Sequence, residues 1–248
     1  MMKVKGFVIE PGANLAKANL FKTDLRQAEL QRANLRQAEL SEAYMKWSDL
    51  SEADLRGATL QSTDLRSATM RGCNLTEADM TEVLLLRTDL TGATLVDAKL
   101  QWANLQHVDL HGANLHRANL SRARLERSLI SKANLKLAIL YGANMIEVDL
   151  HESDLSEANV NAADLFWANL KGAVLFGVDL SSSRLRGANL FGADLREANL
   201  RWANLRGANL EDADLRGADL RNAIVSDEQL RRAKRVERVI LPDGKVVK

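Results

Sequence analysis

Large apolar residues recur at every fifth position of the chain, from Leu15 to Val225. Of these 43 positions, 36 hold Leu, and the others hold Met, Ile or Val. In an α-helix a stripe with this spacing would advance by about 140° per repeat, and in a β-strand it would alternate between the two faces. The chain therefore has to turn once in every five residues, and the pattern predicts a coiled solenoid made of internal repeats.

The other positions of each unit are also restricted. Two residues before each apolar centre stands Ala, Ser, Thr, Val or Cys, from Ala13 to Ala223, and the residue between the two is Asp or Asn in 29 of the 43 units. Asp and Asn side chains bond nearby backbone groups and stabilise turns. We expect the apolar centre and the small residue to point inward and the other three positions to point outward.

The repeated motif, seen in Ala13-Asn14-Leu15 and Ala53-Asp54-Leu55, resembles the A(D/N)LXX repeat of the pentapeptide-repeat family and extends to about residue 227. The resemblance implies an all-β fold, a right-handed quadrilateral β-helix with four units, or 20 residues, in each coil. The residues alone leave that number open, because the glycines cluster at least as well at a spacing of 15 as at 20. With four units per coil, about 11 coils would form a straight rod roughly 50 Å long.

The two ends of the chain depart from the repeat and are predicted to cap the solenoid of residues 13–225. Residues 1–12 contain the apolar run 7–9, which predicts a short strand over the first coil. In residues 226–248, the spacing of Ser226 and Gln229 is that of a capping box and predicts a short helix to about Lys234. A turn is expected at residues 242–244. This tail resembles the C-terminal extension of cyanobacterial-type members of the family.

Charge and composition narrow the function classes. The 34 Lys and Arg nearly balance the 33 Asp and Glu, so no global field draws the protein to nucleic acid or to an anionic membrane. No apolar run has the length of a signal peptide core or a membrane span, and we expect a cytoplasmic protein with no membrane association. The single Cys73 cannot form an intrachain disulfide and is predicted to be a packing residue in an inward position.

Chemistry-bearing side chains do not form a recognisable catalytic or metal-binding motif. His111 and His151 would share a column two coils apart, about 10 Å, which is too far to bind one metal ion. A Ser-His-Asp site needs a concave pocket, and a filled rod does not provide one. We therefore predict a non-enzymatic protein without a catalytic residue, metal, cofactor or small-molecule substrate.

One face of the predicted rod departs from the preference for Asp or Asn before the apolar centre. Of the 14 units without Asp or Asn, five fall at the same place in a 20-residue period, on the face centred on residues 25, 45 and onward to 205. This surface, called face 1 below, carries nine basic and five acidic residues. The neighbouring face 2, centred on residues 30, 50 and onward to 210, carries four basic and nine acidic residues. The predicted partner-binding residues on face 1 are Tyr44, Trp47, Leu84, Arg87, Arg124, Arg127, Ile146, Phe166, Trp167 and Arg184.

Two interpretations of face 1 remain open: a contact surface, favoured by the contiguous Ile146, Phe166 and Trp167, or neutral drift with strand-favouring residues. The first predicts a rigid scaffold or regulatory protein that binds an unknown protein partner. The family resemblance and the acidic face 2 suggest the alternative of a DNA-mimicking inhibitor or protector of DNA gyrase, although no inserted loop is present. Weak nucleic-acid binding by face 1 is a third hypothesis, which the overall neutrality disfavours.

Overall fold

Each five-residue unit closes with a β-turn formed by the two residues that follow its apolar centre. In the computed structural model, which describes residues 2–248, the Ala18 N–H donates to the Leu15 carbonyl at 3.0 Å, and Lys17 has φ 58°. A positive φ at the third residue of a hydrogen-bonded turn is typical of type II. The same positive φ recurs at every fifth residue from Gly12 to Asn222, so the chain changes direction once per unit.

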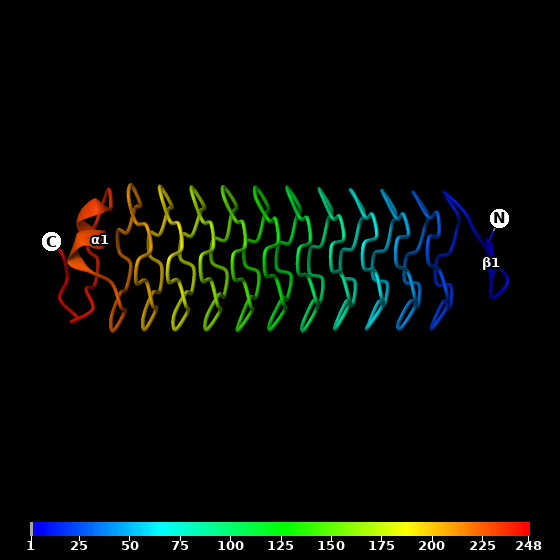
Figure 1. Ribbon diagram of the computed structural model, residues 1–248, viewed down its shortest axis with the longest axis horizontal. Coiled ribbons are helices and arrows are strands. Elements are labelled where there is room, and N and C mark those ends of the chain that lie inside the picture. Colours follow the sequence, from blue (N-terminus) through cyan, green and yellow to red (C-terminus); the bar gives the residue numbers. More distant parts are fainter. Residues whose placement is uncertain (1) are drawn as a thin grey trace.

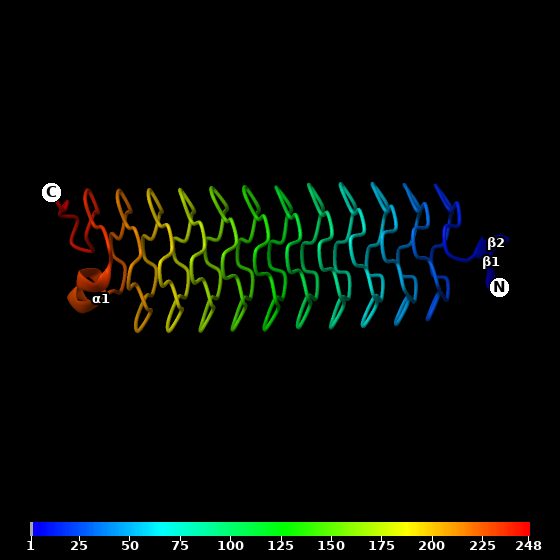
Figure 2. The same ribbon diagram turned by 90° about the horizontal axis from the view of Figure 1, so that it is seen from above.

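Successive coils stack with a period of 20 residues. Asn14 forms a parallel bridge with Asn34, and the equivalent residue of every following unit as far as Asn204 pairs with the residue 20 positions later. The Leu15 N–H donates to the Asn34 carbonyl at 2.7 Å, and the Asn34 N–H donates to the Ala13 carbonyl at 2.9 Å. The number of units per coil is therefore four. The rod is straight, with no loop interrupting residues 13–225 (Figures 1 and 2).

The interior is filled by two kinds of ladder. The apolar centres from Leu15 to Leu220 are at most 2% exposed, and the small residues from Ala18 to Ala223 are at most 7% exposed. Only Ala13 and Val225, at the two ends of the repeat, are partly buried. The prediction that these two positions of each unit point inward is confirmed, and the core is a narrow column that runs the length of the repeats.

The N-terminal end is covered by an antiparallel hairpin of β1 (Met2–Val4) and β2 (Phe7–Ile9). Lys5 and Gly6 have φ of 47° and 84°, as in a two-residue type I′ turn. Met2, Val4 and Phe7 pack against the end of the core. The run 7–9 is thus a strand, and its partner β1 is an element that the sequence pattern does not indicate.

At the other end, α1 (Asp227–Arg232) lies across the last coil, capped by Ser226 with a complete capping box. The helix is two residues shorter than the one predicted to reach Lys234. After it, the chain rejoins the stack, where Arg235 bridges to Asp214 and Ile240 to Asp219. The turn at residues 242–244 then brings Val246 back antiparallel to Ile240.

Candidate protein-binding surface

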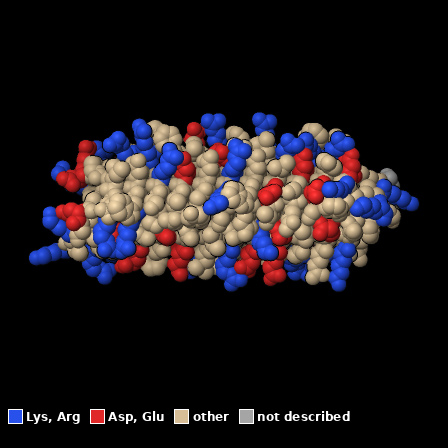
Figure 3. Space-filling view, turned by 90° about the horizontal axis from the view of Figure 1, so that it is seen from below, with Lys and Arg blue, Asp and Glu red and all other residues tan. Residues whose placement is uncertain are grey.

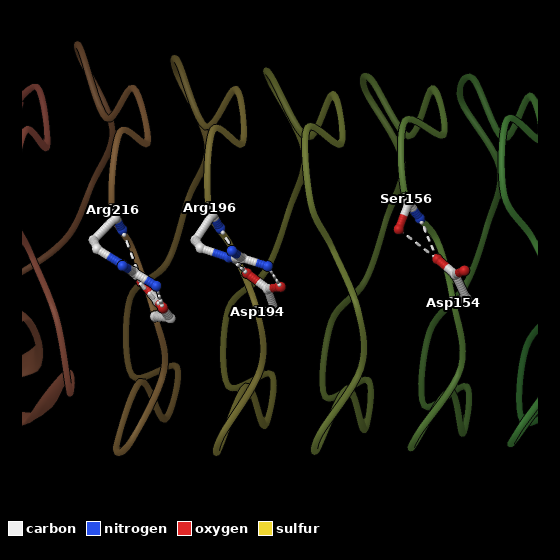
Figure 4. Close-up of polar contacts among 6 residues, drawn as sticks. Asp154, Ser156, Asp194, Arg196 and Arg216 are labelled. Atoms are coloured by element: carbon white, nitrogen blue, oxygen red, sulfur yellow. Dashed lines mark hydrogen bonds and ion pairs between the residues drawn. The ribbon is translucent and has the colours of Figure 1, made fainter.

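The Asp and Asn side chains that recur along the rod are occupied by local contacts. Asp194 Oδ1 accepts the backbone N–H of Arg196 at 3.2 Å, and the Arg196 guanidinium donates to both carboxylate oxygens at 2.8 and 2.6 Å (Figure 4). The same guanidinium holds the pKa of Asp194 below its usual range. Asp154 accepts the Ser156 N–H at 2.8 Å in the same way. Much of the acidic surface therefore stabilises turns, as the sequence predicts.

Ion pairs also neutralise most of the basic residues of face 1. Six of its nine basic side chains lie within 4.0 Å of a carboxylate: Arg26, Lys46, Arg66, Arg124, Arg127 and Arg184. The other three, Arg87, Arg186 and Arg206, have no carboxylate of residues 2–248 within 4.0 Å. Lys and Arg are interspersed with Asp and Glu over the surface drawn in Figure 3. The charge of face 1 is consequently concentrated at three arginines.

An aromatic pair stands out on the C-terminal half of face 1. The Phe166 and Trp167 rings meet edge to face, with centroids 5.9 Å apart and planes at 84°. Trp167 is 61% exposed, and its indole lies so close to Gly187 that a Cβ added there would be 3.0 Å from it. Phe166 is half-buried, and the Arg186 guanidinium lies 6.0 Å from the centroid of its ring. The predicted contact residues Ile146, Phe166, Trp167 and Arg184 therefore lie together on neighbouring coils.

The other predicted residues are more dispersed. Tyr44 and Trp47 are exposed, but Trp47 lies six coils before Trp167, or about 29 Å along the rod. Leu84, Ile146 and Phe166 occupy positions that were expected to point outward, and the structure shows all three partly buried. Arg124 and Arg127 pair with Glu126 and Glu147, at 3.5 and 2.9 Å. The ten residues thus do not form one continuous patch.

The sequence analysis does not single out two exposed tryptophans. Trp102 and Trp202 are 54% and 65% exposed and occupy the corner at which the chain enters face 1, while Trp47 and Trp167 occupy the corner at which it leaves. All four tryptophans stand at the second turn position with positive φ. The signal that could have located these corners is the placement of glycine, since 12 of the 14 glycines occupy the same turn position.

Groups that could perform chemistry are dispersed or buried. His111 Nδ1 lies 2.8 Å from Ser131 Oγ, whereas His151 Nδ1 lies 2.8 Å from Asp149 Oδ1. Burial raises the pKa of the Cys73 thiol to about 12, which keeps it protonated. Within residues 2–248, no three His, Cys, Asp or Glu side chains are grouped as a metal site requires. The helical part of residues 2–248 is also too short to cross a membrane.

Comparison with known proteins agrees with this architecture. The sequence profile of pentapeptide repeats matches residues 13–172 and 183–234 in overlapping segments. Among solved structures, the rod is similar to HetL, a pentapeptide repeat protein involved in heterocyst differentiation regulation from the cyanobacterium Nostoc sp. strain PCC 7120. The two share 34% identity over 93% of this chain and 94% of HetL, with a TM-score of 0.79.

Two further solved structures match less well. QnrB1, a plasmid-mediated fluoroquinolone resistance protein, is 16% identical over 73% of this chain and 89% of its own, with a TM-score of 0.37. The pentapeptide repeat protein alr5209 from Nostoc PCC 7120 is 38% identical over 43% of this chain and 84% of its own, with a TM-score of 0.25. No curated protein matches the sequence. The repeat profile and the near full-length similarity to HetL show that the chain belongs to the pentapeptide repeat family.

Proposed function

We propose that the protein is a non-enzymatic regulatory scaffold that binds a protein partner through face 1. The observation that carries the proposal is the Phe166–Trp167 pair on the surface, the one pair of packed aromatic rings in residues 2–248. The core is filled, so contact with another molecule has to occur on the outer faces. Similarity to HetL, which is involved in the regulation of differentiation, supports a regulatory role.

The rod suits recognition because its surface is held rigidly. Backbone hydrogen bonds join each coil to the next at every unit, so the side chains of face 1 project from fixed positions. A binding surface that is already ordered loses little conformational entropy when a partner docks. Exposed aromatic side chains that become buried at the centre of an interface contribute most of its binding free energy. Phe166 and Trp167 would have this role.

The two alternatives have less support. A DNA-mimicking gyrase inhibitor needs a continuous acidic surface, but face 2 pairs Glu52 with Arg32 and Asp89 with Arg71. Nucleic-acid binding through face 1 is weakened by the ion pairs that occupy six of its nine basic side chains. A gyrase supercoiling assay with micromolar protein tests the first alternative directly, and no inhibition or protection is expected.

The proposal is tested with a partner captured by the tagged protein and then purified. Phe166→Ser combined with Trp167→Ser should weaken binding by roughly 30-fold, or about 2 kcal/mol, because the aromatic anchor is lost. Melting should change little, since neither side chain belongs to the core and surface substitutions usually alter stability by less than about 0.5 kcal/mol. Equilibrium binding and thermal melting are measured on the same samples.

The opposite face offers a matched control, because Arg196 lies 5.5 Å from the ring centroid of Phe176 there, much as Arg186 lies beside Phe166. Phe176→Ser combined with Arg196→Ser should leave binding intact. Equal binding by the Phe166/Trp167 variant and the wild type, or a greater loss in the control, would show that recognition does not use face 1.

A further inference from the structure

A bare corner continues from Trp167 toward the C-terminal end of the rod. On the next two coils the equivalent turn position is glycine: the Trp167 indole lies against Gly187, whereas no atom lies within 4 Å of the place a Cβ would take at Gly207. Beyond Gly207, a depression of about 410 Å³ separates this corner from α1, and Glu211, Gln229 and Arg232 help to line it. The Trp167 indole, the bare backbone at Gly207 and the depression therefore follow one another along the edge of face 1, and this strip is called the channel below.

The dimensions of the channel fit a short extended peptide. Trp167 and Gly207 are two coils apart, and α1 lies about one coil further, so the channel is roughly 14 Å long. An extended chain covers about 3.3–3.6 Å per residue, and about four residues would fill this length. Glycine permits the close approach of another backbone, which a side chain at Gly207 would prevent.

The charges beside the channel indicate the chemistry of that peptide. Arg186 and Arg206 are exposed, and neither has a carboxylate of residues 2–248 within 4.0 Å, whereas Arg184 pairs with Asp164 at 3.2 Å. Asp164 is the single acidic residue in the face 1 units 163–167, 183–187 and 203–207. Guanidinium groups bind carboxylates in a bidentate geometry. One unpaired guanidinium therefore lies beside the Phe166 ring, and a second follows on the next coil.

We propose that this channel binds an extended segment of a protein partner in which an aromatic or large aliphatic side chain and Asp or Glu residues lie within about four positions of each other. The apolar side chain packs on Phe166 and Trp167, and the carboxylates pair with Arg186 and Arg206. A nucleic acid fits less well, because carboxylates already pair with six of the nine basic side chains of face 1. This assignment rests on the proposed function of face 1.

The test uses a phage-displayed library of random peptides about 12 residues long, selected on the full-length protein. Enriched peptides should combine one aromatic or large aliphatic residue with at least two acids. For a synthetic peptide of that class, fluorescence anisotropy should show binding about tenfold or more weaker with Arg186→Glu plus Arg206→Glu. Arg196→Glu plus Arg216→Glu, the same change at the equivalent positions of the opposite face, should leave the affinity unchanged. Binding should also weaken as NaCl rises from about 0.05 M to about 0.5 M.

Enrichment of basic peptides, no enrichment, or equal binding by the double variant would overturn the assignment. Tighter binding of a single-stranded oligonucleotide than of the selected peptide would overturn it too.

The two proposals fail in different ways. A purified partner that requires Phe166 and Trp167 but ignores Arg186 and Arg206 contradicts only the acidic segment, whereas a partner that ignores all four contradicts the function of face 1.

Discussion

The second turn position of each unit is constrained by its backbone. Its φ lies between 53° and 72° in every repeat from Gly12 to Asn222, in the left-handed region that disfavours branched side chains. Among the residues found there, glycine is the most frequent, and Val, Ile and Thr are absent. The polarity of this position shows no pattern, since it holds charged, aromatic and glycine residues. Its steric restriction is nevertheless visible in the residue types.

Gly92 allows the backbone contribution to be measured alone, because a Cβ added there would meet no atom within 4 Å. Gly92→Val should lower the free energy of unfolding by about 1–2 kcal/mol, the cost of a left-handed conformation for a residue with a side chain. Gly92→Asn should cost less, since Asn tolerates this region. Urea unfolding measures both. Equal stability of the Val and Asn variants would indicate that the turn relaxes instead of holding its positive φ.

At the scale of elements, the sequence predicts what local patterns encode and misses what tertiary contacts decide. The capping box locates the start of α1 because Ser226 and Gln229 are neighbours on one helical turn. The helix ends early because Ala233 is extended and the Lys234 N–H donates to the Ala213 carbonyl at 2.9 Å, a contact with the preceding coil. β1 is missed for a similar reason, since its three residues have no pattern of their own without the β2 partner.

Gln229 performs two functions at the end of the rod. Its Oε1 accepts the Ser226 N–H at 3.0 Å, while its Nε2 donates to the carbonyls of Leu205 and Ala208 at 2.7 and 2.8 Å. In the regular stack, the backbone N–H of residue 229 would bond the Ala208 carbonyl, as the Asn209 N–H bonds that of Ala188. The side-chain amide replaces this missing bond and satisfies the edge of the last coil.

We expect Gln229→Glu to destabilise the protein by about 1–3 kcal/mol, because Glu preserves the capping box but leaves the Ala208 carbonyl without its donor. Ser226→Ala is the matched variant that removes the cap and keeps the amide, with an expected loss of about 1 kcal/mol. Thermal unfolding and limited proteolysis of the C-terminal end provide the measurements. Wild-type stability in Gln229→Glu would mean that water satisfies the edge equally well.

At the scale of the whole molecule, the period of five residues predicts a rod with a filled core and no inserted loops. The residues that lie on face 1 can then be listed once the coil is known to contain 20 residues. The proximity of Ile146, Phe166 and Trp167 could be anticipated because column neighbours are fixed by the period. The ion pairs, such as that between Arg127 and Glu147, could not be anticipated, because they depend on side-chain conformations. The channel beside Gly187 and Gly207 also requires the position of α1, which only the folded chain specifies.

A protein partner that covers the C-terminal half of face 1 would shield Trp167, and hydroxyl-radical footprinting with mass spectrometry tests this without any substitution. The four tryptophans provide internal controls, because all have exposures between 54% and 65%. On addition of the partner, we expect the oxidation of Trp167 to fall severalfold while that of Trp47 and Trp102 stays unchanged. Protection of Phe176 on the opposite face, or unchanged oxidation of Trp167 in a saturated complex, would contradict the account.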